Sequence, residues 1–321
     1  MKFSLVSTIF NEASRLQESI NDIERQTLLP NEVVIVDAGS KDGTLDILNQ
    51  WKLGSNIDIK IIVNKGCNVA EGRNIAISQA SYELIVSTDF GCRYHPEWLQ
   101  SLITPFNDEN VEVVAGNFAV KSSMLSTPAA KSAYLLASGY KNIMDEHFIP
   151  SSRSIAYYKK VWSSVGGYPE WVTLAGDDTY FGYQLKNAGY SFYLSSKPMV
   201  YWERHADAIA YDKEAYRYGL GDGETKDSVN QRNALVKFIE LLLRVGCLVF
   251  LILSFLLESF LYPFIIAVIC AIGFRPYVKL FKFWIKEFPK FTLHHLVRAI
   301  LMLESNRWHY LKGYLKGLRN K

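Results

Sequence analysis

Residues 1–90 alternate between apolar runs and amphipathic segments. Four β-rich apolar runs have the length of strands buried in a parallel sheet. These runs are Phe3–Ile9, Glu32–Asp37, Ile57–Val63 and Tyr82–Thr88. The stretches between them have helical spacing, at residues 13–26, 44–51 and 72–79. Because short links join strand to helix in the order βαβαβαβ, the pattern predicts an α/β fold with a mainly parallel sheet flanked by helices.

Residues 90–205 show a weaker alternation, in which Pro, Gly and polar residues are frequent. Helical spacing remains at 96–106, 126–145 and 177–188. We expect this part of the chain to cover the sheet and to form one wall of a ligand site.

The C-terminal third changes character near residue 235. Val245–Phe274 is an apolar run with one charge, Glu258, whereas one bilayer span needs about 20 apolar residues. Residues 276–321 hold ten Lys or Arg and two acids, a formal charge of +8 (10 − 2), with aromatic residues between the lysines. That pattern is typical of helices lying on an anionic membrane surface.

Two membrane arrangements fit the apolar run, and a third reading needs no membrane. A single span would place the basic tail opposite the N-terminal domain, whereas a hairpin over about 245–274 keeps both on the cytoplasmic side, as the positive-inside rule favours. The alternative is a helical subdomain with a solvated basic face.

Composition narrows the choice of partners. The net charge is only +3, which argues against a nucleic-acid binder. The four cysteines form no CxxC pair, so we expect free thiols in a reducing compartment. The N-terminus lacks the apolar core and cleavage site of a signal peptide, so we expect the first domain at the cytoplasmic face of the cell membrane.

Several polar side chains follow the predicted strands directly, where ligands of such sheets bind. They are Asn11, Glu12, Asp37 and Asp89. Residues 64–71 form a loop that opens a predicted helix. Arg73, and as a second choice Lys65, could meet a diphosphate near this helix N-terminus, although either could equally be a surface residue.

Two further positions could carry chemistry. Asp177 and Asp178 begin a predicted helix, so they either cap it or supply a general base. His205 could bind a metal, but a single histidine is more often structural. Asp89 likewise could bind a ribose or a metal, or cap the helix that follows.

Five motifs in order resemble the family 2 glycosyltransferases of GT-A (Rossmann-like) fold. They are VSTIFNE, VDAGSKDGT, AEGRNIAISQA, LIVSTDFGC, and VGGYPE followed by GDDTYFGYQLKNAGY. The resemblance covers about residues 1–205. Together with the apolar run and the basic tail, it predicts a GT-A catalytic domain over 1–235, followed by a helical membrane-anchoring region over 236–321.

The resemblance implies a role for each matching residue. Asp178 looks like the general base, with Asp177 beside it. Gly167, Glu170 and Trp171 would line the acceptor side. The nucleotide-sugar site would comprise Thr8, Asn11, Glu12, Asp37, Lys65, Arg73 and Asp89.

The resemblance also implies Mg²⁺ or Mn²⁺ at Asp89 and His205. The DxD motif of the family is incomplete here, because Gly91 stands where the second acid, a principal metal ligand, is expected. Ala38 is a second departure, since many relatives have an acid there.

The expected reaction is an inverting transfer from a nucleotide-diphosphate sugar to a glycan or lipid-linked saccharide of envelope polysaccharide synthesis. One alternative is transfer to a polyprenyl phosphate, which is already anionic and needs no base. The others are a non-catalytic membrane module of the same fold and a nucleotidyltransferase, which would release pyrophosphate.

Overall fold

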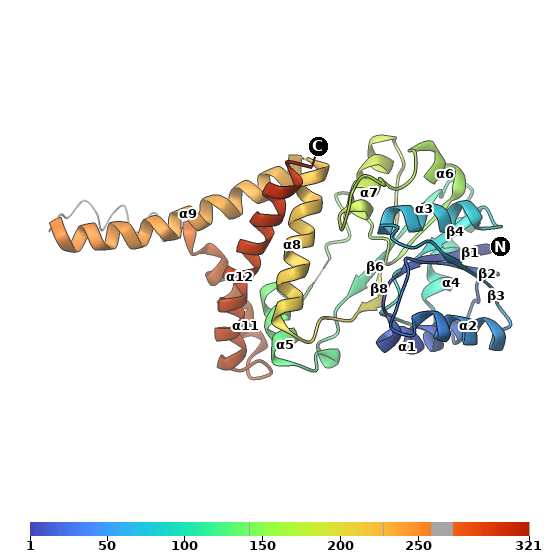
Figure 1. Cartoon of the computed structure of the whole chain (residues 1–321), viewed down its shortest axis with the longest axis horizontal. Helices are drawn as coiled ribbons and strands as arrows, with labels where there is room; N and C mark the ends of the chain where they lie inside the picture. The colour runs from blue at the N-terminus through green and yellow to red at the C-terminus, as the bar shows by residue number, and fades with distance from the viewer. Residues whose placement is uncertain (141, 227, 258–271, 321) are drawn as a thin grey trace. The chain divides into compact units, whose positions relative to one another are not determined.

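The computed structural model describes residues 1–140, 142–226, 228–257 and 272–320. These residues group into two compact units (Figure 1). Unit 1 is Met1–Met124 with Lys141–Arg204, and unit 2 is Leu125–Tyr140 with His205–Lys321. The functional boundary at residue 235 stays a prediction.

Unit 1 is built on an eight-stranded sheet in the order β3-β2-β1-β4-β7-β6-β8-β5. Its first four strands lie where the apolar runs predict them and are mutually parallel. The strands are β1 (Phe3–Ile9), β2 (Glu32–Asp37), β3 (Asp58–Val63), β4 (Leu84–Ser87), β5 (Cys92–Tyr94), β6 (Val113–Ala119), β7 (Ile155–Tyr158) and β8 (Tyr193–Trp202).

The sheet is mixed: its first four strands are parallel, as predicted, and β6 and β8 are parallel to each other, but the other pairings are antiparallel. Strand β7 runs antiparallel to both β4 and β6, and β5 runs antiparallel to β8. Residues 90–205 therefore contribute four strands to the sheet itself. Gly116 within β6 and Pro198 within β8 interrupt the apolar pattern, which is why sequence periodicity does not reveal these strands.

Helices cover both faces of this sheet (Figure 1). Apolar residues of α1, α2 and α4 pack on one face and those of α3, α6 and α7 on the other, because successive strand residues point to opposite sides. The helices are α1 (Ala13–Glu24), α2 (Thr44–Gly54), α3 (Val69–Gln79), α4 (Trp98–Ile103), α6 (Lys159–Ser164) and α7 (Asp177–Asn187), with 3-10 turns η1 (Thr104–Asn107) and η2 (Ser122–Met124).

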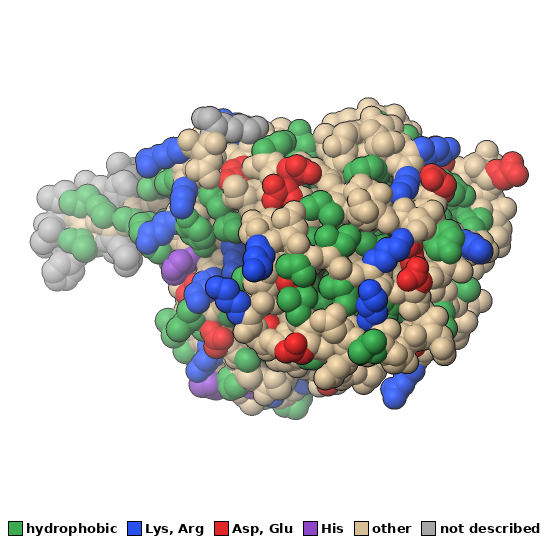
Figure 2. Space-filling view, turned by 45° about the vertical axis from the view of Figure 1, so that its right-hand side comes forward, with side chains coloured by type: hydrophobic (Ala, Val, Ile, Leu, Met, Phe, Trp, Pro, Cys, Tyr) green, Lys and Arg blue, Asp and Glu red, His purple; other side chains and the backbone are tan. Residues whose placement is uncertain are grey.

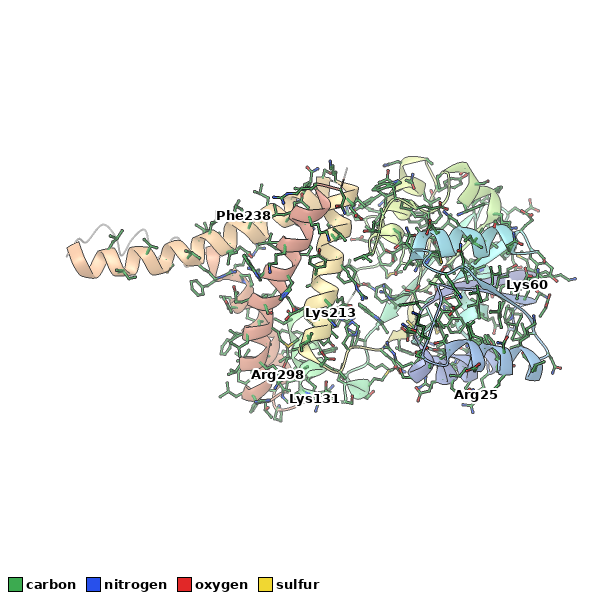
Figure 3. All side chains as sticks on the ribbon, viewed as in Figure 1. Arg25, Lys60, Lys131, Lys213, Phe238 and Arg298 are labelled. Carbon is green, nitrogen blue, oxygen red and sulfur yellow. The ribbon has the colours of Figure 1, made fainter. Side chains whose placement is uncertain are left out.

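Unit 2 is helical over its described residues. Its helices are α5 (Pro128–Leu136), α8 (Ala208–Thr225), α9 (Ser228–Leu257), α11 (Arg275–Glu287) and α12 (Leu293–Gly317). Helix α5 covers only part of the helix predicted over 126–145. Figure 3 shows Lys131, Lys213, Phe238 and Arg298 projecting from α5, α8, α9 and α12, respectively.

Helices α8 and α12 touch backbone to backbone. Each carries two glycines four residues apart, Gly219 and Gly223 on α8 and Gly313 and Gly317 on α12. A Cβ atom on Gly219 would lie 2.0 Å from the carbonyl oxygen of Tyr310. Real Cβ atoms do not approach so closely, so only glycine permits this packing.

The predicted apolar hairpin over about 245–274 includes residues 258–271, which lie outside the described residues. In the part of the chain that the structure describes, no helix has both the length and the apolar character needed to cross a membrane. The choice between one span and a hairpin therefore stays a prediction.

Candidate active site

The loops that follow β1 and β2 are joined by side-chain hydrogen bonds. Asn11 adopts a positive φ of 53°, its backbone N–H donates to Ser40 Oγ at 2.8 Å, and its Oδ1 accepts from Lys41 N at 2.9 Å. Asp37, fully buried at the end of β2, accepts through Oδ1 from the N–H groups of Gly39 and Ser40. Its Oδ2 is also buried and has no hydrogen-bond partner among the described residues.

Helix α3 begins close to the end of β1. Asn68 caps this helix in a capping box with Glu71, which fixes the first turn. A Cβ on Gly72 would lie 2.4 Å from Thr8 Cγ2, so a side chain at position 72 would push the helix from the strand. This close approach places Arg73, one residue further on, beside the end of the sheet.

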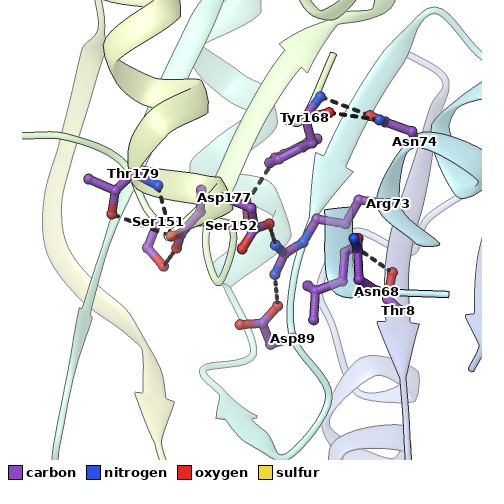
Figure 4. Close-up of polar contacts among 12 residues, drawn as sticks. Thr8, Asn68, Arg73, Asn74, Asp89, Ser151, Ser152, Tyr168, Asp177 and Thr179 are labelled. Atoms are coloured by element: carbon purple, nitrogen blue, oxygen red, sulfur yellow. Dashed lines mark hydrogen bonds and ion pairs between the residues drawn. The ribbon is translucent and has the colours of Figure 1, made fainter. Parts of the chain in front are cut away.

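Arg73 joins two carboxylates that come from distant parts of the chain (Figure 4). Its Nη2 lies 2.6 Å from Asp89 Oδ1, after β4, and its Nη1 donates to Asp177 Oδ2, at the start of α7. The guanidinium also lies over the Tyr168 ring, 5.4 Å from its centroid. Arg73 is only 4% exposed, so the loss of either carboxylate would leave its buried charge less well compensated.

This cluster separates the acid strengths of its two carboxyls. Burial would raise the pKa of Asp89, but the charges of Arg73 and Arg153 outweigh it and hold the pKa below its usual range. Burial raises the pKa of Asp177 despite Arg73, and the neighbouring charges of Asp178 and Asp89 raise it further. Asp89 is therefore fixed as an anion.

Asp178 is the more accessible acid of its pair. Its Oδ2 accepts from Ser151 Oγ at 2.9 Å, and its Oδ1 accepts from the backbone N–H of Thr179 at 2.8 Å. Asp178 is half-buried, whereas Asp177 is buried against Arg73. Of the two, Asp178 thus has the better access to the proton of a bound acceptor.

A cavity of about 370 Å³ lies beside α7 in unit 1. All three residues predicted on the acceptor side line it, namely Gly167, Glu170 and Trp171. Asn74 orders this wall, because its side-chain amide donates to Glu170 Oε1 and to the Tyr168 carbonyl, each at 2.9 Å. Trp171 is 44% exposed and stands edge-on to Tyr180.

The remaining predicted residues lie apart from the Arg73 cluster or serve local contacts. Glu12 pairs with Arg15 at 3.3 Å. Lys65 is exposed and packs on Gly39. His205 belongs to unit 2, where its Nε2 lies 3.6 Å from Glu214 Oε1.

The surroundings of Asp89 do not fit a divalent ion bound as the family resemblance implies. Its two oxygens face Arg73 and Arg153, and Gly91 offers no second carboxylate. Among the described residues, no group of three His, Cys, Asp or Glu side chains could bind a metal ion. The metal site predicted at Asp89 and His205 stays a prediction.

Sequence reasoning missed Arg153 and Ser151. Both precede β7, which pairs antiparallel with β4 so that Ile155 lies opposite Ser87. The start of β7 is therefore next to the end of β4 and to Asp89. Only recognition of β7 as an antiparallel neighbour would have revealed this proximity.

The chain has the fold of the GT-A glycosyltransferases. Residues 4–161 match the family model described as Glycosyl transferase family 2. Over this stretch, just under half of the chain, the sequence is similar to that family, in agreement with the motifs.

Similar proteins include two curated glycosyltransferases. Glycosyltransferase AglE of Haloferax volcanii is 26% identical over 191 residues, which cover 59% of this chain and 62% of AglE. O-antigen chain rhamnosyltransferase RfbN of Salmonella typhimurium is 25% identical over 228 residues, 68% of this chain and 70% of RfbN.

Among solved structures, a mannosyltransferase shares the fold. The mannosyltransferase PcManGT from Pyrobaculum calidifontis, in complex with GDP-Man and Mn²⁺, matches with a TM-score of 0.54 and 15% identity. The match covers 99% of this chain and 86% of that one.

Proposed function

We propose that this glycosyltransferase moves a sugar, with inversion, from a nucleotide-diphosphate sugar to a hydroxyl of a glycan or lipid-linked saccharide. The observation that carries this proposal is the Arg73 cluster, in which Asp89 and Asp177 meet across one guanidinium and Asp178 follows Asp177 in the chain. It supports a donor site at Asp89 next to an acceptor site at Asp178.

The donor would lie along the carboxyl ends of β1, β2 and β4. Asp37 Oδ2, buried and without a partner among the described residues, is suited to accept a hydrogen bond from the nucleotide base. The Asp89 carboxylate is suited to the ribose hydroxyls. Because the side chains around Asp89 do not fit a divalent ion, the proposed reaction includes no step on a metal.

In the reaction, Asp178 would accept the proton of the acceptor hydroxyl while that oxygen attacks the anomeric carbon. The bond to the diphosphate breaks, and the nucleoside diphosphate leaves with the bonding electrons. Trp171 and Glu170, which line the 370 Å³ cavity, are suited to bind the acceptor sugar by stacking and hydrogen bonding.

We also propose envelope polysaccharide synthesis at the cytoplasmic membrane surface as the setting. RfbN, by its name, extends an O-antigen chain, which supports a polysaccharide acceptor. In unit 2, α11 exposes Val278, Phe281 and Ile285 on one stripe, with lysines beside them at 279, 282 and 286. Figure 2 shows basic and hydrophobic side chains intermingled over the unit 2 helices.

Such a stripe is suited to the headgroup region of an anionic bilayer, where apolar side chains enter and lysines meet phosphates. Replacing Phe281 and Ile285 by Ser should lower binding to anionic vesicles at least tenfold, since each buried side chain contributes about 1.5–3 kcal/mol. Leu53→Ser removes an 88% exposed apolar residue of α2 and serves as the control. Equal vesicle binding by the double variant and the control would contradict the surface assignment.

The proposed activity is tested by offering UDP-, GDP- and dTDP-sugars with membrane lipid extract. A sugar transferred to a lipid-linked or glycan acceptor supports the proposal. Binding of nucleotide sugar without transfer or hydrolysis would favour the non-catalytic module.

A further inference from the structure

Two arginines compete with any metal ion for Asp89. Arg73 Nη2 lies 2.6 Å from one carboxylate oxygen, and Arg153 Nε lies 3.7 Å from the other. A divalent ion would have to displace at least one of these cations from a carboxylate whose pKa they lower.

The backbone at Gly91 explains why the second acid of the motif is missing. Gly91 has a φ of +89°, which side-chain-bearing residues rarely adopt. A Cβ there would lie 3.0 Å from Glu12 Oε2, so an aspartate would approach a carboxylate that already pairs with Arg15. This local structure disfavours the usual metal ligand at position 91.

Arg153 is held in place from three sides. Its guanidinium lies 4.1 Å from the ring centroid of Trp202, and its Nη1 donates to Ser151 Oγ at 3.0 Å. Its backbone carbonyl accepts from Thr88 Oγ1 at 2.9 Å, which ties it to the residue before Asp89. The side chain is 17% exposed, so the charge is ordered yet reachable.

A second guanidinium lies on the same indole. Arg204, the last residue of unit 1, lies 3.7 Å from the ring centroid of Trp202. Both guanidinium groups thus make cation–π contacts with Trp202, and both keep their charge. Planar guanidinium groups match phosphate oxygens bidentately, which makes them suited to a diphosphate.

We propose that Arg153, with Arg204 in contact with the same indole, binds the donor diphosphate and supplies the positive charge that a divalent ion supplies in metal-dependent relatives. This inference rests on the proposed nucleotide-sugar site. Donor binding and sugar transfer then require no divalent metal. The leaving nucleoside diphosphate is stabilised by fixed guanidinium groups, which need no reorganisation as its charge develops.

The test measures binding of UDP, GDP and dTDP to the full chain by calorimetry, in EDTA and again with Mg²⁺ or Mn²⁺. We expect at least one of these to bind equally well in both conditions. Arg153→Met should weaken that binding about 10- to 100-fold, the usual effect of losing a hydrogen bond to a charged group. The corresponding nucleoside should bind the variant as it binds the wild type, since it carries no phosphate.

The control is Arg25→Met, which removes the same charge from an exposed position after α1 (Figure 3). It should bind each nucleotide as the wild type does. Arg153→Lys should lie between the wild type and Arg153→Met, because lysine keeps the charge without the planar fork. If Arg153→Met does not fold, Arg204→Met carries the same test from the other guanidinium.

Three results would overturn the inference or its basis in distinguishable ways. Diphosphate binding that disappears in EDTA and returns with Mn²⁺ would restore the metal and refute the arginine assignment, while the proposed function stands. Wild-type affinity in Arg153→Met would refute the assignment too. Failure of every nucleoside diphosphate to bind, with or without metal, would instead refute the proposed function.

Discussion

Replacing Asp178 by Asn tests the proposed general base at the smallest structural cost. Asn keeps an acceptor for the Thr179 N–H, and the Ser151 hydroxyl can rotate to accept from the new amide. The free energy of unfolding should therefore change by no more than about 1 kcal/mol, the net contribution of one hydrogen bond. Arg73 keeps Asp89 and Asp177, so nucleoside diphosphate binding should be unchanged.

The rate of sugar transfer should fall strongly even though the free energy of unfolding changes little, because an amide cannot take up the proton of the acceptor hydroxyl. General-base assistance is typically about 10²–10⁴-fold, which corresponds to about 2.7–5.4 kcal/mol of activation free energy. The assay is the rate of sugar transfer at saturating donor, with nucleotide binding measured in parallel. Asp145→Asn is the control, since this exposed carboxylate also accepts from a backbone N–H, that of His147.

Near-normal turnover of Asp178→Asn with a hydroxyl acceptor would refute the base assignment. If the variant transfers efficiently only to a polyprenyl phosphate, the anionic acceptor of the alternative reaction is indicated, because that acceptor needs no base.

Three other predictions follow from the packing and the pKa shifts. Gly219→Ala should destabilise the fold, because its Cβ would lie 2.0 Å from the Tyr310 carbonyl oxygen. Gly246→Ala, where a Cβ meets open space, should instead stabilise α9 by about 1 kcal/mol. Equal changes in the melting temperature of the two variants would contradict the contact between α8 and α12. Asp89→Asn should lower the free energy of unfolding above about pH 4. The difference from the wild type should shrink as the pH falls below the carboxyl pKa of the unfolded chain, since the stability that comes from a lowered carboxyl pKa is lost there. A difference that stays constant down to acid unfolding would refute the ion pair. Burial raises the pKa of the Cys92 thiol to about 12, so iodoacetamide at pH 8 should leave Cys92 unmodified in the native protein, as mass spectrometry would show.

The fold of residues 1–90 could be predicted from sequence because residues close together in the chain determine it. The runs Phe3–Ile9 and Glu32–Asp37 are mostly apolar, as is typical of strands buried on both faces, and their structural bounds agree with the prediction. The position of Asp37 and Asp89 at strand ends followed directly, since parallel strands end at one edge.

The second half depends on contacts between residues far apart in the chain. Strand β7 has only four residues, and its place between β4 and β6 is set by tertiary pairing. Without it, Arg153 is one polar residue in the stretch PSSRS. The Arg73–Asp177 pair spans more than one hundred residues, and no local pattern encodes such a partner.

The backbone contacts between α8 and α12 could not be predicted from sequence, for a related reason. Glycines at 219, 223, 313 and 317 weaken a helix when they are considered alone. Their value emerges only when two helices bring these positions together, where any Cβ would collide with the opposite backbone.

We propose that Asp37, Arg73, Asp89 and Asp178 form one site for a sugar nucleotide and its acceptor. The most direct measurement is chromatographic identification of the nucleotide released when the purified chain acts on UDP-, GDP- and dTDP-sugars with membrane lipid extract. We expect a nucleoside diphosphate in amounts equal to the glycosylated product, and loss of both in Asp178→Asn. Release of pyrophosphate, or transfer unaffected by Asp178→Asn and Asp89→Asn, would contradict it.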